Sequence, residues 1–340
     1  MAVGLLSAFL SGLVAFFIAR AIARNAASLG LVQNPNERSS HKAPTPSGGG
    51  VGIVAGGLVA AVPLALEIAW PTLAVLGLSL VVAAIGFIDD RRHIPAPLRL
   101  AAQLIITGIL IGIAPLDAVA AQLSQHLPFL LVAALFILAA VYWLNLFNFM
   151  DGIDGLAASQ AAFMLIAAAL IAATSNGMST ETPLLWWMVG VSGAALGFLL
   201  LNWAPAKIFM GDAGSTWLGF IIAALCLWTI SLGWLSLWQW LILGALFITD
   251  ATLTLVRRTL RGENPLKAHR LHAYQHLSRR WGGHGRVTLL YVAVNVVLLL
   301  PLAWAAGLLP GVALGATIAA YVPLVAGLLW AGAGEREAVA

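Results

Sequence analysis

The sequence has little charge and almost no cysteine. Only 9% of its 340 residues are Asp, Glu, Lys or Arg, and 61% are apolar. An ordinary soluble domain is about 25% charged, so a soluble globular domain is excluded. The single cysteine, Cys226, excludes a disulfide bond within the chain. The formal charge of +4 does not indicate nucleic-acid binding, because such binding requires a soluble basic face.

Long apolar segments make up most of the chain. A helix that spans a bilayer needs about 20 apolar residues. Eleven such segments are present, at about 2–24, 49–69, 72–88, 100–116, 128–147, 156–174, 184–201, 213–231, 235–254, 287–306 and 310–330. The sequence therefore predicts an all-α polytopic membrane protein with about eleven transmembrane helices, which form one domain over residues 1–340.

The basic residues are distributed unevenly between the segments that connect these helices. All 17 Lys and Arg residues lie at the end of the first segment, in alternate connections or beyond the last segment. The other connections contain none; they are 70–71, 117–127, 175–183, 232–234 and 307–309. Because basic residues remain on the cytoplasmic side, we predict an external N-terminus and a cytoplasmic C-terminus. The first apolar segment ends in Arg20 and Arg24 rather than in a signal-peptide cleavage site, so it is interpreted as a retained helix.

Five aspartates stand at the predicted cytoplasmic ends of apolar segments, namely Asp89, Asp90, Asp151, Asp154 and Asp212. Carboxylates at membrane depth are costly, which makes them candidates for function. Asp89 and Asp90 are adjacent, and adjacent helical residues point about 100° apart. We therefore expect one of them to bind a metal or act as a base while an arginine holds the other. A solvated helix end is the alternative.

Two further motifs contain the remaining acids. Asn148, Asp151 and Asp154 in NLFNFMDGIDGLA are three residues apart, so they would share one face of a helix, and a simple turn is the alternative. Asp212 in FMGDAGS precedes a helix, and a purely structural N-cap is the alternative to a functional role there. Magnesium is usually bound by one or two carboxylates together with phosphates, so Asp154 and Asp212 suggest a metal site.

Two basic segments accompany the acids. In RSSHKAPTPSGGGVG, a glycine run before a helix can bind phosphate through its amides. In AHRLHAYQHL, the histidines at 269, 272 and 276 would share a helix face beside Arg270. Arginine and histidine near carboxylates suit a diphosphate bound with a metal. Attraction to anionic lipid is the alternative explanation.

Together, SHKAPTPSGGG, GFIDD, NLFNFMDGIDGLA, FMGDAGS and AHRLHAYQHL resemble the polyprenyl-phosphate N-acetylhexosamine-1-phosphate transferases, over about residues 33–286. The resemblance implies a multi-pass protein of the bacterial inner membrane with its active site at the cytoplasmic face. Its expected donor is a UDP-N-acetylhexosamine and its acceptor undecaprenyl phosphate, and the products are undecaprenyl-diphosphate-sugar and UMP. The expected cofactor is Mg²⁺, or Mn²⁺ in its place. Membrane lipid is a further partner, and a homodimer is an open option.

The resemblance also implies roles for individual residues. Asp154 and Asp212 would bind the metal, and Asp89 or Asp90 would orient or deprotonate the acceptor phosphate. The implied substrate contacts are Lys42, Arg99, Asn148, Asp151, Arg270 and His272.

The last basic loop departs from the family pattern. That loop often carries a His-x-His-His cluster, and here only His272 matches it. The departure favours the branch that initiates O-antigen or other surface polysaccharides over phospho-MurNAc-pentapeptide translocase, and it leaves Tyr274, Gln275 and His276 without an assigned role. A secondary transporter is a further alternative, but its site would lie near the membrane midplane. Asp250, the one acid inside a span, is explained by snorkelling or by pairing with Arg257.

Overall fold

The computed structural model describes residues 2–33, 43–116, 128–175, 182–264 and 269–336. Most of the described residues are helical, and a two-stranded antiparallel ribbon is formed by β1 (Val32–Gln33) and β2 (Thr45–Pro46). The first helices are α1 (Ala2–Leu29), α2 (Gly50–Ala60), α3 (Val62–Ala65), α4 (Trp70–Arg91), α5 (Ala96–Ile113), α7 (Phe129–Phe149) and α8 (Leu156–Ser175). The later helices are α9 (Pro183–Asn202), α10 (Asp212–Ser231), α11 (Leu237–Leu243), α12 (Ala245–Leu260), α13 (Ala273–Trp281), α14 (His284–Val294), α15 (Leu300–Leu308) and α16 (Ala313–Ala331).

The helices confirm the predicted class of an all-α polytopic membrane protein. Within the described part of the chain, 9 helical segments are long and apolar enough to cross a membrane, and the bent pair α11 and α12 makes up to 10. The predicted span 49–69 corresponds to the shorter helix α2 followed by the single turn α3. Pro63 near the start of α3 has no N–H to donate, which explains why α2 does not continue as one long helix.

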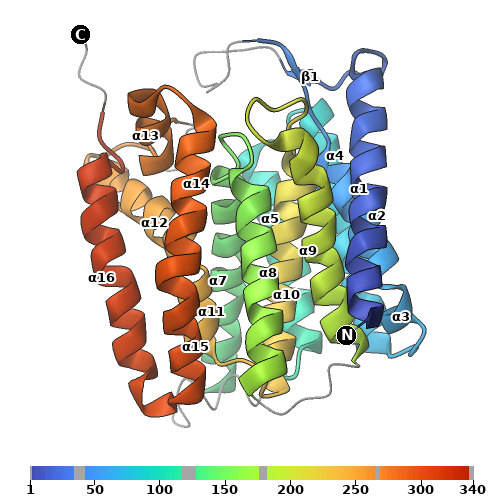
Figure 1. Ribbon diagram of the computed structural model, residues 1–340, viewed down its shortest axis with the longest axis vertical. Coiled ribbons are helices and arrows are strands. Elements are labelled where there is room, and N and C mark those ends of the chain that lie inside the picture. The colour runs from blue at the N-terminus through green and yellow to red at the C-terminus, as the bar shows by residue number, and fades with distance from the viewer. Residues whose placement is uncertain (1, 34–42, 117–127, 176–181, 265–268, 337–340) are drawn as a thin grey trace.

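Helix α1 begins at one end of the bundle and α16 ends at the other (Figure 1). The end that contains β1, α13 and the end of α16 also contains the start of α10. We call it the predicted cytoplasmic end, because the orientation in a membrane remains a prediction from the basic residues.

Helix α10 lies in the interior of the bundle and begins at Asp212. It packs against α2, α4, α7 and α8. Its fully buried side chains include Trp217, Leu218 and Phe220. The predicted site residue Asp212 therefore stands at the end of a well-supported helix.

A helix break lies beside this core and is satisfied internally. Helices α11 and α12 meet at an angle of 71°. The backbone carbonyl of Leu243 at the break accepts a hydrogen bond from Gln160 Nε2 (3.1 Å). Gln160 Oε1 in turn accepts one from Asn295 Nδ2 (2.6 Å), at the start of a π-helical turn, Asn295–Leu299. A membrane offers no water to free backbone groups, so these buried amides allow the break to exist there.

Candidate active site

Asp90 caps the N-terminus of α10. Its carboxylate accepts hydrogen bonds from the backbone N–H groups of Asp212 (2.7 Å) and Ala213 (3.2 Å). These N–H groups have no partner within their own helix, and a negative charge is favourable at a helix N-terminus. The alternative interpretation of Asp212 as the N-cap is wrong, because Asp212 is the first helical residue and Gly211 precedes it without a side-chain cap.

The backbone around this cap is tightly packed. Gly211 has φ +75°, a conformation that favours glycine, and a side chain there would clash with the carboxylate of Asp90. A Cβ atom at Gly86 of α4 would lie 2.5 Å from the backbone oxygen of Asp212. The close approach of α4 and α10 thus depends on residues without side chains.

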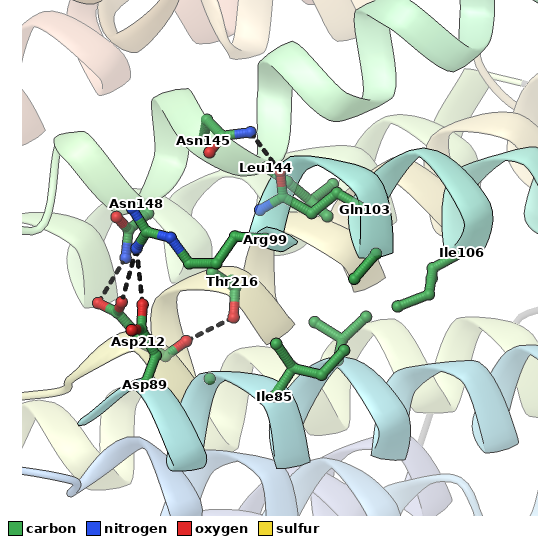
Figure 2. Close-up of a pocket in the computed structure, with 13 residues that line it drawn as sticks. Ile85, Asp89, Arg99, Gln103, Ile106, Leu144, Asn145, Asn148, Asp212 and Thr216 are labelled. Carbon is green, nitrogen blue, oxygen red and sulfur yellow. Dashed lines mark hydrogen bonds and ion pairs between the residues drawn. The ribbon is translucent and has the colours of Figure 1, made fainter. Parts of the chain in front are cut away.

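Polar residues from three other helices, Arg99, Asp89 and Asn148, lie next to Asp212. Arg99 Nη1 lies 2.7 Å from Asp89 Oδ2 and 3.4 Å from Asp212 Oδ2. Asn148 Nδ2 donates to Asp212 Oδ1 at 2.8 Å. Figure 2 shows Arg99 and Asn148 approaching the neighbouring carboxylates of Asp89 and Asp212 from the same side. The expectation that an arginine holds one carboxylate of the Asp89–Asp90 pair is confirmed.

The two carboxylates beside Arg99 differ in accessibility. The side chain of Asp89 is 3% exposed, and its Oδ1 also accepts the N–H of Ile94 at 2.6 Å. The side chain of Asp212 is 30% exposed. The buried carboxylate of Asp89 therefore fixes the position of Arg99, while the carboxylate of Asp212 is accessible to a ligand.

A pocket begins at this polar cluster and extends between α4, α5 and α7 (Figure 2). Its polar end contains Asp89, Arg99, Asn148 and Asp212. The apolar wall is formed by Val82, Ile85, Ala102, Ile106 and Leu144. Further along, Asn145 Nδ2 donates to Gln103 Oε1 at 2.6 Å. Such a pocket matches a ligand with a charged head and an apolar body.

The DGIDG segment is a turn rather than part of a helix. Helix α7 ends at Phe149 and α8 begins at Leu156, so the prediction that Asn148, Asp151 and Asp154 share one helix face is wrong. Gly155 has φ +76°, which interrupts a right-handed helix. The turn nevertheless brings Asp151 close enough to interact with the other carboxylates.

Asp151 and Asp154 have different surroundings. Burial and the nearby charges of Asp212, Asp90 and Asp154 raise the pKa of Asp151 well above its usual range. Asp154 Oδ2 accepts the N–H of Ala206 (3.0 Å), and its Oδ1 lies 3.1 Å from His284 Nδ1. Asp154 therefore contacts the segment before α10 and the start of α14, whereas Asp212 contacts α5 and α7.

The donor set suits a magnesium ion that also binds phosphate oxygens. No group of three or more His, Cys, Asp or Glu side chains is arranged to hold a metal without further ligands among the residues that the structure describes. Magnesium usually takes only one or two carboxylates and fills its other positions with phosphate and water. A bound cation would offset the negative charge that raises the pKa of Asp151.

The basic loop before α13 lies next to the DGIDG turn. His272 is buried and stacks on Tyr274, with ring centroids 5.5 Å apart. The hydroxyl of Tyr274 donates to the backbone oxygen of Phe149 at 2.9 Å. Tyr274 thus supports the turn that carries Asp151. The histidines at 269, 272 and 276 do not share a helix face, since α13 begins only at Ala273.

Arg270 and Lys42 are the two other residues predicted to contact a substrate. Arg270 is half-buried, and its backbone oxygen accepts a hydrogen bond from Arg279 Nη2 at 3.0 Å. Lys42 lies outside the described residues.

Asp250 has a role that sequence reasoning missed. It is fully buried and accepts hydrogen bonds from the N–H groups of Ala273 (2.9 Å) and Tyr274 (3.1 Å) and from the hydroxyl of Tyr291 (2.7 Å). Its expected pairing with Arg257 is wrong, because Asp250 instead caps α13. An acid inside an apolar span was the signal that pointed to such a role.

Asn202 and His284 were also missed. Asn202 accepts the N–H of Gly155 (3.0 Å) and donates to the backbone oxygen of Ile208 (2.9 Å), so it links the DGIDG turn to the segment before Asp212. Its position at the end of an apolar span was a weak signal. No sequence feature distinguished His284.

Comparison with known proteins shows the family of this chain. The family model described as "Glycosyl transferase family 4" matches residues 72–230. The decaprenyl-phosphate N-acetylglucosaminephosphotransferase of Mycobacterium tuberculosis H37Rv is 32% identical over 330 residues, which cover 84% of this chain and 79% of that protein. The same enzyme of Mycobacterium leprae is 32% identical, with 84% and 80% covered. The phospho-N-acetylmuramoyl-pentapeptide-transferase of Mycolicibacterium vanbaalenii is 34% identical over 256 residues, with 63% and 70% covered.

The helical bundle and its charged pocket, together with these relatives, define a polytopic membrane transferase. The chain belongs to glycosyl transferase family 4 and, within it, to the polyprenyl-phosphate hexosamine-1-phosphate transferases.

Proposed function

We propose that this protein transfers an N-acetylhexosamine 1-phosphate from a UDP-sugar to undecaprenyl phosphate in the bacterial inner membrane. The products are undecaprenyl-diphosphate-sugar and UMP. The observation that carries the proposal is the pocket in which Arg99 and Asp212 stand at one end and apolar side chains of α4, α5 and α7 form the wall. A prenyl phosphate has the same division into charged head and apolar chain.

A second cavity supports a long apolar acceptor. It lies between α7, α10, α11 and α12, has a volume of about 260 Å³ and is lined mainly by apolar side chains. Leu146 of α7 lines this cavity, while Leu144 and Asn145 of the same helix line the charged pocket. A prenyl chain whose phosphate is bound at Arg99 would have this cavity available beside α7.

The reaction forms one bond and breaks one. An oxygen of the acceptor phosphate attacks the sugar-bearing phosphorus of the donor, and the bond from that phosphorus to the bridging oxygen breaks, so that UMP leaves. Catalysis of this kind is mainly positioning and stabilisation of negative charge. Arg99, oriented by Asp89, would hold a phosphate, and Asn148 orients the carboxylate of Asp212.

A bound Mg²⁺ would supply neutralisation of the diphosphate charge. Asp212 is the proposed ligand with an accessible carboxylate, and Asp151 is its neighbour in the acidic cluster. Asp154, the second ligand predicted from the sequence, borders the cluster while its oxygens contact Ala206 and His284.

Asp89 and Asp90 would act by positioning. Both already accept hydrogen bonds, from Arg99 and Ile94 and from the start of α10, respectively. The acceptor phosphate has a second pKa near 6, so most of it is ionised at pH 7 without a base.

The donor is proposed to be UDP-N-acetylglucosamine or a related UDP-N-acetylhexosamine, for O-antigen or another surface polysaccharide. The relatives include proteins named for N-acetylglucosamine phosphate transfer, which supports this donor class. Phospho-MurNAc-pentapeptide transfer is the second candidate, because relatives with that name also match.

The test is a product assay. Purified protein in detergent is incubated with undecaprenyl phosphate, Mg²⁺ and each of a panel of UDP-N-acetylhexosamines and UDP-MurNAc-pentapeptide, with and without EDTA. UMP release that requires the metal and one donor supports the proposal and identifies the sugar. Release of UDP instead of UMP, or no nucleotide product with any donor, contradicts it.

The sole cysteine provides an independent test of acceptor binding. Cys226 lines the apolar cavity and is partly exposed, so slow labelling by a small apolar thiol reagent would report on this one position. Undecaprenyl phosphate is expected to slow this labelling, whereas free inorganic phosphate is not. Equal labelling rates with and without the lipid contradict binding of the prenyl chain in this cavity.

A further inference from the structure

The segment that follows α16 packs back onto the bundle. Helix α16 ends at Ala331, and Ala333 is completely buried. We call residues Gly332–Arg336 the C-terminal strap. It lies at the predicted cytoplasmic end, where α12, α13 and α16 meet (Figure 1).

Arg257 of α12 anchors the strap. Its Nη1 donates to the backbone oxygen of Ala333 at 2.7 Å, and its Nη2 lies 3.0 Å from Glu335 Oε1. A second anchor joins Arg336 Nε to Glu263 Oε1 at 2.9 Å. Hydrogen bonds from Arg261, Arg336 and Arg258 lower the pKa of Glu263 to about 2, so this carboxylate stays ionised at neutral pH.

The strap also holds the loop before α13. The N–H of Gly334 donates to the backbone oxygen of Leu271 at 2.7 Å, and the backbone oxygen of Glu335 lies 3.2 Å from His276 Nε2. Leu271 stands between Arg270 and His272, the two residues of this loop expected to contact the donor.

A continuous series of contacts leads from this loop to the acidic turn. His272 stacks on Tyr274, and the Tyr274 hydroxyl binds the oxygen of Phe149, two residues before Asp151. Displacing Leu271 would therefore move groups on the donor side of the site. Within the described part of the chain, the side chains of Arg99 and Asp212 bond to Asp89, Asn148 and each other, away from the strap.

We propose that the C-terminal strap positions the 269–272 loop for donor binding, with Arg257 as the main positioning residue. The inference rests on the proposed function, because it assigns the loop to the UDP-sugar. Loss of the strap would raise the KM for the donor while leaving kcat and the KM for the prenyl phosphate nearly unchanged.

The experiment compares Arg257→Ala with Arg261→Ala. Both substitutions remove one arginine from the same end of α12, and both arginine side chains are 31% exposed. Arg261 forms an ion pair with Glu263. When Arg261 is replaced, Glu263 still has its ion pairs with Arg258 and Arg336. Gly334→Pro is a second disrupting variant, because it removes the N–H that binds Leu271 and proline cannot adopt the φ of +74° at this position. Each protein is examined by steady-state UMP release and by amide hydrogen exchange of residues 269–276.

For Arg257→Ala and Gly334→Pro we expect faster exchange of 269–276 and a donor KM raised by about fivefold or more, the scale of a lost hydrogen bond. Arg261→Ala should stay within about twofold of wild type, since a partly exposed ion pair contributes little. The proposal is overturned if exchange is unchanged, if Arg257→Ala matches Arg261→Ala, or if kcat falls and both KM values rise together with a loss of thermal stability. Absence of UMP release from the wild type would count against the proposed function, while the exchange data would still decide whether the strap holds the loop.

Discussion

Substitution of Asp90 separates a capping role from a role in proton transfer. The Asp90 carboxylate accepts two backbone hydrogen bonds, from Asp212 at 2.7 Å and Ala213 at 3.2 Å. Asparagine has nearly the same shape and keeps one acceptor oxygen, so it can retain one of these bonds. Alanine retains neither.

The magnitude follows from these two bonds. A hydrogen bond to a charged group contributes about 1.5–3 kcal/mol, so Asp90→Asn should lose about 2 kcal/mol and Asp90→Ala about 4 kcal/mol. If the whole loss appears as poorer positioning of Asp212 in the transition state, the rates fall by about 30-fold and about 1,000-fold, respectively. Asp90→Ala should also lower the thermal unfolding temperature, because the first turn of α10 loses its cap.

The assay measures initial rates of UMP release at saturating substrates, together with thermal unfolding in the same detergent. Glu67→Gln, an exposed acid in the connection before α4, serves as the matched control and should behave as wild type. A general base contributes up to about 10⁴-fold, so a loss of that size in Asp90→Asn with unchanged thermal stability would refute the capping argument.

Three further substitutions test the rest of the site. Asp212→Asn should reduce UMP release by about 1,000-fold with unchanged unfolding temperature, since it removes charge next to the transferred group; near wild-type rates would rule out a metal at Asp212. Gly86→Ala places a Cβ 2.5 Å from the Asp212 oxygen and should destabilise the protein by about 1–3 kcal/mol in thermal unfolding. Its control, Gly108→Ala, has nothing within 4 Å of the new Cβ, and an equal effect of both would contradict the packing argument. Tyr274→Phe loses the bond to Phe149, about 1 kcal/mol, so the donor KM should rise by about fivefold in steady-state assays; an unchanged value would separate Tyr274 from donor binding.

The sequence predicted the class and most of the polar end of the site. Hydropathy is a local property, so the apolar segments appear as helices in the structure at nearly the expected positions. The ends of these helices also placed Asp89, Arg99, Asn148 and Asp212 at one end of the bundle, where the structure joins them. The segment at 49–69 was less predictable, because glycines and Pro63 divide it into two shorter helices.

Local patterns left two conformations open at other positions. The spacing of Asp151 and Asp154 fits a helix face and equally a turn, and the turn forms with Gly155 at φ +76°. The same ambiguity affected His269, His272 and His276. Spacing alone does not reveal where a helix begins, and α13 begins at Ala273, where Asp250 caps it from another helix.

What the sequence by itself determined was the membrane class, the predicted orientation and the set of residue types available for chemistry, since hydrophobicity and charge act through each segment separately. Only the tertiary structure decided which carboxylate is accessible and which is used as a cap. Asp90 meets Asp212 across 122 positions of the chain, and Asp154 meets His284 across 130. These partners depend on how the helices pack, because hydrogen bonds to buried backbone groups form only where packing brings the atoms within reach.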